Sequence, residues 1–263
     1  ECLKQEDDAL FKRLVNAVSG GKLSLIGSTY HNTISSLFST EIFNWELDMY
    51  KKLVKKYFKT VPEVFLNTEA IYLNSMAPEV KAAGYKVLIT EGLGWYLGGK
   101  SPNQLFLSSE KDLKLLLNSD VGDGEAGGVK AVNLYPLQQE MDVAQKIEDL
   151  NFQYELIEAE AAIEKYEATA FYRVPMPIGR PDAGHFGYFV ENTMQREIID
   201  KIEFLLSRGA NNGLNLTGEL AAFTSISYFR EMNYKSLSSL SGQPYDFYIS
   251  FMNILSDFEL RNF

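Results

Sequence analysis

Apolar residues recur first at helical and then at strand spacing along the first third of the chain. Apolar side chains three and four residues apart predict an amphipathic helix over residues 9–18, which ends at Gly20-Gly21. The same spacing predicts helices over residues 41–58 and 78–83. Short apolar runs between the helices are typical of buried strands, at residues 23–26, 64–66 and 86–89. Helices that alternate with strands predict parallel β/α units.

The second half of the chain is predicted to be mainly helical. Helical spacing is found over residues 138–169, 192–208, 217–232 and 244–260. Stretches rich in glycine predict surface loops at residues 92–109 and 120–128. The proline-rich stretch 174–181 cannot be helical. We therefore expect a barrel-type domain over residues 1–135 and a mainly helical domain over residues 136–263, with a boundary near residue 175 as the alternative.

One polar segment interrupts an otherwise apolar stretch. Asn67-Thr68-Glu69 directly follows the predicted strand 64–66, and apolar residues resume at Ala70. In parallel β/α folds, the carboxyl ends of the strands build the active site. Glu69 is therefore either a solvated loop residue or a carboxylate placed at a strand end for chemistry.

Composition narrows the choice of partners. The 263 residues carry a net charge of −10, which argues against a nucleic-acid partner. One cysteine and two histidines exclude the usual thiolate and zinc sites, so no metal or other cofactor is expected. No apolar run reaches the length of about 20 residues that a membrane helix needs, and no signal peptide is visible. These observations favour a cytoplasmic protein without membrane or nucleic-acid partners; they leave its oligomeric state open.

A family resemblance begins at the polar segment. Residues 64–72 resemble the Phe-x-Asn-Thr-Glu segment of α-amylases in glycoside hydrolase family 57. Other stretches resemble the family in the same order, at residues 26–30, 36–38, 83–95, 101–103, 192–195 and 252–259. The resemblance covers roughly residues 20–118 and 190–260 and is weak between them.

The resemblance implies an α/β fold, an incomplete or distorted (β/α)₇ barrel followed by a C-terminal helical bundle. It implies hydrolysis or transfer of α-glucan bonds with retention of configuration. Such a reaction needs a carboxylate nucleophile and a carboxylic acid about 5–5.5 Å apart. Glu69 matches the position of the family's glutamate nucleophile. The expected partner is an α-glucan or oligosaccharide.

The second carboxylate is harder to place. The segment 123–127 contains Asp123 and resembles the acid/base motif of related branches of the family. An alternative alignment puts residues 131–135 on the strand before the acid/base, which leaves Leu137 and Gln139 where carboxylates belong. Asp123 is therefore the candidate acid/base, and a glycine-rich turn is the alternative.

Other family positions have changed. Ser28 and Asn32 occupy positions where the family has a glutamate and a histidine, with His31 one place away. In the late helix, Ile226 and Ser227 replace an aspartate–histidine pair. The family's first motif, a strand that contains a histidine, has no counterpart here.

Four residues are candidates for substrate binding. His31 and Asn32 could hydrogen-bond sugar hydroxyl groups, and Trp95 and Tyr96 could stack on a sugar ring. The alternatives are a structural histidine and loop aromatics that close the barrel.

Three hypotheses about function follow. The first is a retaining α-glucan hydrolase or glucanotransferase that uses Glu69. The second is a catalytically silent relative that binds glycan or regulates a partner. The third is a structural protein whose former cleft is filled by side chains.

Overall fold

The computed structural model describes residues 2–118, 148, 151–152, 155, 157–168, 170–179, 189–233 and 243–263. Asp123, the segment 131–135, Leu137, Gln139 and the predicted domain boundary at residues 135–136 lie outside the described residues. Within the described residues, no helix is long and apolar enough to cross a membrane.

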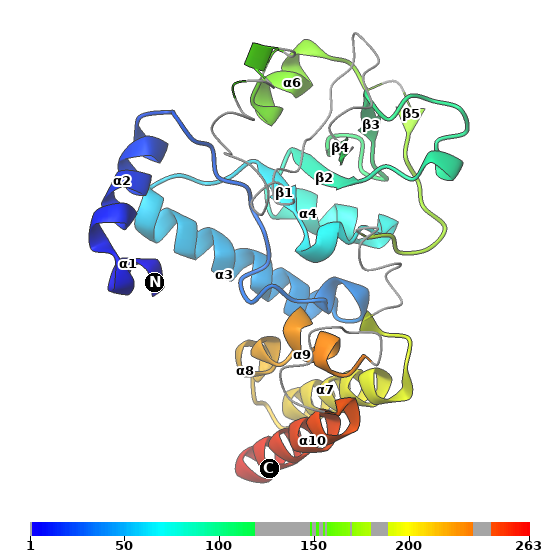
Figure 1. Cartoon of the computed structure of the whole chain (residues 1–263). Coiled ribbons are helices and arrows are strands. Elements are labelled where there is room, and N and C mark those ends of the chain that lie inside the picture. Colours follow the sequence, from blue (N-terminus) through cyan, green and yellow to red (C-terminus); the bar gives the residue numbers. More distant parts are fainter. Residues whose placement is uncertain are drawn as a thin grey trace.

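A five-stranded mixed sheet forms the centre of the N-terminal part (Figure 1). Its strand order is β1-β2-β4-β3-β5. Strands β1, β2 and β4 are parallel, β3 runs antiparallel to β4, and β5 is parallel to β3. The strands are β1 Val64–Leu66, β2 Val87–Glu91, β3 Leu105–Leu107, β4 Lys114–Asn118 and β5 Ala170–Phe171.

Hydrophobic residues pack on both faces of this sheet. Successive residues of a strand point to opposite faces, so neighbouring apolar residues enter different cores. Leu88 of β2 belongs to one core, whereas its neighbours Val87 and Ile89 belong to another. The N-terminal helices and the helix above the sheet in Figure 1 are α1 Cys2–Glu6, α2 Asp8–Ser19, α3 Thr40–Phe58, α4 Ala77–Ala82 and α6 Ala159–Lys165.

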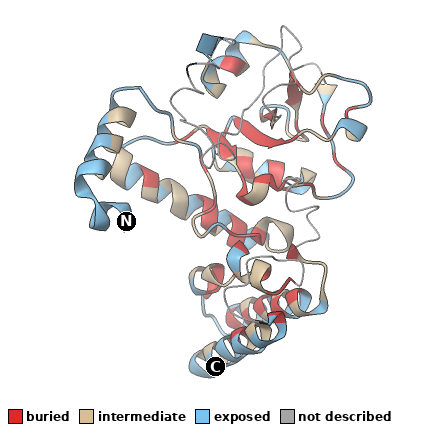
Figure 2. Ribbon diagram, viewed as in Figure 1, coloured by how far each residue is buried: buried red, intermediate tan, exposed pale blue. Residues whose placement is uncertain are grey.

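Helix α3 connects the sheet region to the C-terminal helices. It begins where the Ser39 hydroxyl accepts a hydrogen bond from the Ile42 N–H at 3.3 Å. Phe43 and Leu47 pack into the core beneath the sheet, and Ile42 packs into a separate core among the C-terminal helices. Figure 2 shows buried residues in the sheet and along α3.

The C-terminal part is a group of helices packed around that separate core, at the bottom of Figure 1. Helix α7 begins with a capping box, in which the side chains of Asn192 and Gln195 each bind the other's backbone N–H. The helices are α7 Thr193–Asn211, α8 Thr217–Ala222, α9 Ile226–Glu231 and α10 Pro244–Asn262.

Several predicted elements are confirmed and others are wrong. Strand 64–66 exists with its predicted limits and strand 86–89 exists within two residues of its limits, but the strand over 23–26 does not form. Only Gly27 pairs there, through a parallel bridge to Phe65. A side chain at Gly27 would collide with the Tyr85 ring, so this close approach requires glycine.

Two of the predicted helices differ from the structure. The predicted helix 217–232 is divided into α8 and α9, because the Thr224 hydroxyl donates to the Ala221 carbonyl and helps to end α8. The described part of the predicted helix 138–169 is not continuous, since residues 157–158 are not helical. The predicted loop 92–109 contains strand β3. Residues 174–179 are not helical, as predicted.

Candidate active site

The segment that carries Glu69 is a tight 3₁₀ turn, Thr68–Ala70, directly after β1. Asn67 holds both sides of the turn: its side-chain oxygen accepts from the Thr68 N–H at 2.9 Å, and its amide group donates to the Ile71 carbonyl at 3.0 Å. The chain then enters two different cores at successive residues, with Ile71 among the C-terminal helices and Tyr72 beneath the sheet. Glu69 therefore lies at the end of a strand and at the junction of two cores.

The backbone of this region is strained. Glu69 and Ala70 have φ angles of 50° and 51°, and Asn32, which faces the turn, has a φ of 56°. The left-handed conformation costs roughly 1–2 kcal/mol for a residue with a side chain. Strain of this kind persists where the surrounding structure holds it, and it is often found at functional sites.

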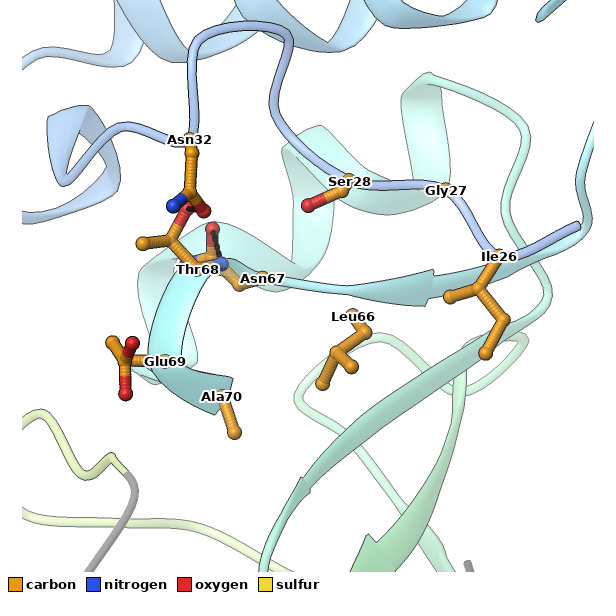
Figure 3. A pocket seen from close by; sticks show the side chains of 9 residues that line it. All are labelled: Ile26, Gly27, Ser28, Asn32, Leu66, Asn67, Thr68, Glu69 and Ala70. Atoms are coloured by element: carbon orange, nitrogen blue, oxygen red, sulfur yellow. Dashed lines mark hydrogen bonds between the residues drawn. The ribbon is translucent and has the colours of Figure 1, made fainter. Parts of the chain in front are cut away.

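A cavity of about 260 Å³ opens beside the turn (Figure 3). In the view of Figure 3, Asn32, Thr68 and Glu69 lie on one side, Ile26 lies on the other, and Ser28 and Leu66 lie between them. The residues that line it are Ile26, Gly27, Ser28, Asn32, Leu66, Asn67, Thr68, Glu69 and Ala70. An open cavity beside Glu69 does not favour the hypothesis of a cleft filled by side chains.

A directed chain of hydrogen bonds orients Asn32 in this cavity. The Thr68 hydroxyl donates to the Asn32 side-chain oxygen at 3.0 Å, as Figure 3 shows. The Thr29 hydroxyl lies 3.0 Å from the Thr68 oxygen and must therefore be the donor to it, while it accepts from the Thr33 N–H. The side-chain oxygen of Asn32 is thus engaged, and its side-chain NH₂ group makes no hydrogen bond to another described residue. It is free to donate to a ligand.

The Glu69 carboxylate is bound by a residue that the sequence did not suggest. Arg230, in the last turn of α9, donates from Nη2 to Oε1 of Glu69. The Glu69 side chain is 16% exposed and that of Arg230 is 42% exposed, so the pair is reached by solvent. Arg230 lies three residues after Ser227, on the helix where the family pattern has changed. That break in the pattern was the signal that could have drawn attention to it.

His31 is held by the buried carboxylate of Glu46, on α3. Oε2 of Glu46 accepts from the His31 backbone N–H, and Nδ1 of His31 lies beside Oε1, both at 2.7 Å. The Trp45 ring stacks on His31 with centroids 5.8 Å apart. Burial raises the pKa of the Glu46 carboxyl, and the hydrogen bonds from His31 act in the opposite direction. This arrangement fixes the loop that carries Asn32.

Comparison with known proteins identifies the family. Residues 1–205, most of the chain, match the family model of glycosyl hydrolase family 57. The chain belongs to glycosyl hydrolase family 57. The matched segment contains β1, Glu69 and every residue that lines the cavity. The resemblance noted in the sequence is confirmed.

A curated relative matches the chain only in part. A protein of Methanocaldococcus jannaschii, named as a candidate alpha-amylase, is 41% identical over 111 residues. The match covers 42% of this chain and 23% of that protein. The matched segment therefore spans less than a quarter of the length of this relative.

Solved structures of family 57 enzymes share the fold. The 4-alpha-glucanotransferase from Thermococcus litoralis is 10% identical with a TM-score of 0.57, and the match covers 88% of this chain and 43% of that one. An alpha-amylase from Thermotoga maritima gives 10% identity, a TM-score of 0.60 and coverages of 97% and 71%. A branching enzyme from Pyrococcus horikoshii is 12% identical with a TM-score of 0.58, and the match covers 96% of this chain and 66% of that one. These matches confirm the predicted fold class, a distorted (β/α)₇ barrel followed by helices.

The structure brings together some of the candidate site residues of this family 57 chain. Glu69 and Asn32 line one cavity, whereas His31, the next residue along the chain, is bound to Glu46. Trp95 and Tyr96 lie on a short turn after β2, contact each other edge to face, and are not among the lining residues. Asp123 lies outside the described residues. Sequence reasoning missed the lining roles of Thr68 and Ser28.

Proposed function

We propose that this chain carries the nucleophile of a retaining enzyme that hydrolyses or transfers α-glucan bonds, and that Glu69 is that nucleophile. The observation that carries the proposal is the place of Glu69, in the turn that follows a parallel strand and among the residues that line a cavity. Family 57 membership supports the substrate class, because the enzymes of this family act on α-glucans.

The proposed reaction uses one carboxylate oxygen of Glu69. This oxygen attacks the anomeric carbon and forms a C–O bond while the glycosidic bond breaks, and the electron pair leaves with the departing oxygen. Water or a sugar hydroxyl then displaces Glu69 and loses a proton, which gives hydrolysis or transfer. An acid must protonate the departing oxygen, and Asp123 is the candidate from the sequence.

The cavity suits the first sugar ring of such a substrate. Its volume of about 260 Å³ is slightly smaller than that of typical small-molecule sites, which begin at about 300 Å³. It can hold one pyranose ring rather than a length of glucan. The Asn32 NH₂ group and the Ser28 hydroxyl offer hydrogen bonds to sugar hydroxyl groups, while Ile26 and Leu66 offer an apolar surface.

An activated donor tests the nucleophile separately from the acid. Fluoride leaves 5-fluoro-α-glucosyl fluoride without protonation, so the first step needs Glu69 but not the acid/base. We expect a covalent glycosyl adduct on the peptide that contains Glu69, detected by mass spectrometry. Glu69→Gln should abolish the adduct and lower turnover of α-glucosyl fluoride on the order of 10³-fold or more.

The control is Glu63→Gln, at the opposite end of β1, where Glu63 pairs with Lys86 at 2.7 Å. This variant should keep the adduct. Wild-type protein that forms no adduct and releases no sugar from maltooligosaccharides would contradict the proposal.

A glycan-binding role without catalysis is the second candidate. It is favoured by two neutral residues in the cavity, Ser28 and Asn32, at positions where the family resemblance places a glutamate and a histidine. This role predicts saturable binding of maltooligosaccharides in calorimetry without turnover or adduct. Calorimetry that shows no heat of binding would exclude it.

A further inference from the structure

We propose that Arg230 is a positioning residue that holds one oxygen of the Glu69 carboxylate and leaves the other for attack on the sugar. The inference rests on the proposed function, since it assigns Arg230 a part in the same reaction. It concerns a contact between two segments that are distant in the sequence, the turn after β1 and the short helix α9.

The contact occupies the two carboxylate oxygens unequally. Arg230 donates to Oε1 of Glu69, and no other described residue donates to Oε2. A carboxylate at the end of a flexible side chain rotates broadly about its last torsion. A donor fixed on one oxygen restricts that rotation and presents the other oxygen to the cavity.

Arg230 can act in this way because the start of α9 is hydrogen-bonded to residues 32–34, in the loop that carries Asn32. The Ile226 backbone N–H donates to the backbone carbonyl of Asn32 at 3.0 Å, and the Ile34 backbone N–H donates to the backbone carbonyl of Thr224 at 3.1 Å. The same loop therefore places Asn32 in the cavity and sets the position of α9.

The end of α9 is fastened by the capping residues of α7. The Gln195 side chain donates to the Phe229 carbonyl at 2.9 Å, and the Asn192 side chain donates to the Met232 carbonyl at 3.0 Å. These two carbonyls flank Arg230 in the chain. The side chain of Phe229 is fully buried, and the Arg230 guanidinium lies 5.9 Å from the Phe189 ring centroid.

Stability alone does not account for such support. Ion pairs between partly exposed side chains add little to folding stability. A carboxylate that must attack one carbon atom gains more from fixed orientation, because small misplacements of a reacting group lower the rate steeply. The planar guanidinium suits this task better than the flexible ammonium group of lysine.

The test compares Arg230 variants in the first step of the reaction with α-glucosyl fluoride. Single-turnover measurements give the rate constant of adduct formation and the apparent dissociation constant separately. Arg230→Met should lower the rate constant by about 10- to 100-fold and leave the dissociation constant within about twofold. Arg230→Lys should restore part of the rate, and so should added guanidinium ion with Arg230→Met.

The matched control is Arg208→Met. Arg208 makes an ion pair of the same kind with Glu259 between α7 and α10, and neither residue lines the cavity. This variant should react at the wild-type rate.

Two results overturn the inference and can be told apart. A wild-type adduct together with an unchanged or faster rate in Arg230→Met overturns the positioning role alone. A wild-type protein without any adduct overturns the positioning role together with the proposed function. Circular dichroism of Arg230→Met establishes that the variant is folded, so a lost rate is not a lost fold.

Discussion

At the residue scale, the geometry of the site depends on a few residues that are held by close contacts and hydrogen bonds. Gly27 approaches the Tyr85 ring so closely that a β-carbon would lie 2.3 Å from it. Asn67 closes the strained turn on both sides, and Thr68 links that turn to Asn32. The result is a cavity wall held by short polar contacts rather than by hydrophobic packing alone.

The buried carboxyl of Glu46 makes the stability of this region depend on pH. Its folded-state pKa is raised above the ordinary value of 4.5, mainly by burial. As pH rises through about 4.5, the unfolded chain loses this proton while the folded protein keeps it. Stability from this group is therefore greatest at low pH and falls as pH rises toward the folded-state pKa.

Glu46→Gln removes this titration and tests it. The difference in unfolding free energy between wild type and variant should shrink as pH rises from about 4.5, because only the wild type has a carboxyl to ionise. The variant also loses one acceptor for His31, which costs about 1 kcal/mol at every pH. Urea unfolding at several pH values measures the difference; a difference that grows with pH would contradict the expectation.

At the scale of elements, the short helices of the C-terminal part depend on their neighbours. Helix α9 spans only Ile226–Glu231, and isolated helices of this length are unstable in water. It is held by hydrogen bonds from Gln195 and Asn192 and by the loop that contains Asn32. The capping residues of α7 thus serve two helices.

Asn192→Ser separates these two tasks of Asn192. Serine can still cap α7 at its first turn, but it is too short to reach the Met232 carbonyl of the α9 end. We expect a loss of stability of less than about 1 kcal/mol and a several-fold lower rate of adduct formation on Glu69. Thermal unfolding and the single-turnover assay measure the two effects. A wild-type rate would show that this hydrogen bond does not help to place Arg230.

At the scale of the whole molecule, α3 joins the sheet region to the helical region. Phe43 and Leu47 face one core and Ile42 faces the other, so neither core keeps its full packing if α3 unfolds. Glu69 lies where the chain crosses between the same two cores. The ion pair with Arg230 therefore requires both regions to be folded together.

Ile42→Ala tests this coupling. Ile42 is fully buried, and its truncation should cost about 2–5 kcal/mol. Far-UV circular dichroism and tryptophan fluorescence should report one shared unfolding transition that moves to lower urea. Ile249→Ala, at an exposed position of α10, should change stability by less than about 0.5 kcal/mol. Two separate transitions, of which only one moves, would contradict the coupling.

The local pattern of apolar and polar residues determined where several helices and strands form and where Glu69 lies relative to β1. The apolar run 64–66 and the polar residues after it place Glu69 at a strand end, and the structure confirms that place. The amphipathic stripe over residues 41–58 predicts α3 nearly to its ends. Helix and strand periodicity depends on neighbouring residues, so it can be read without the fold, and the same residues carry the family resemblance.

Tertiary structure alone decided which residues share the site. Arg230 meets Glu69 across 161 positions, and no local pattern links the two. His31 and Asn32 look equivalent in the sequence, but packing against α3 gives one to Glu46 and the other to the cavity. Residues 23–26 resemble a strand in the sequence, yet only the following residue, Gly27, pairs with β1. Such outcomes depend on which distant groups packing brings within hydrogen-bonding distance, and no local pattern in the sequence reveals that.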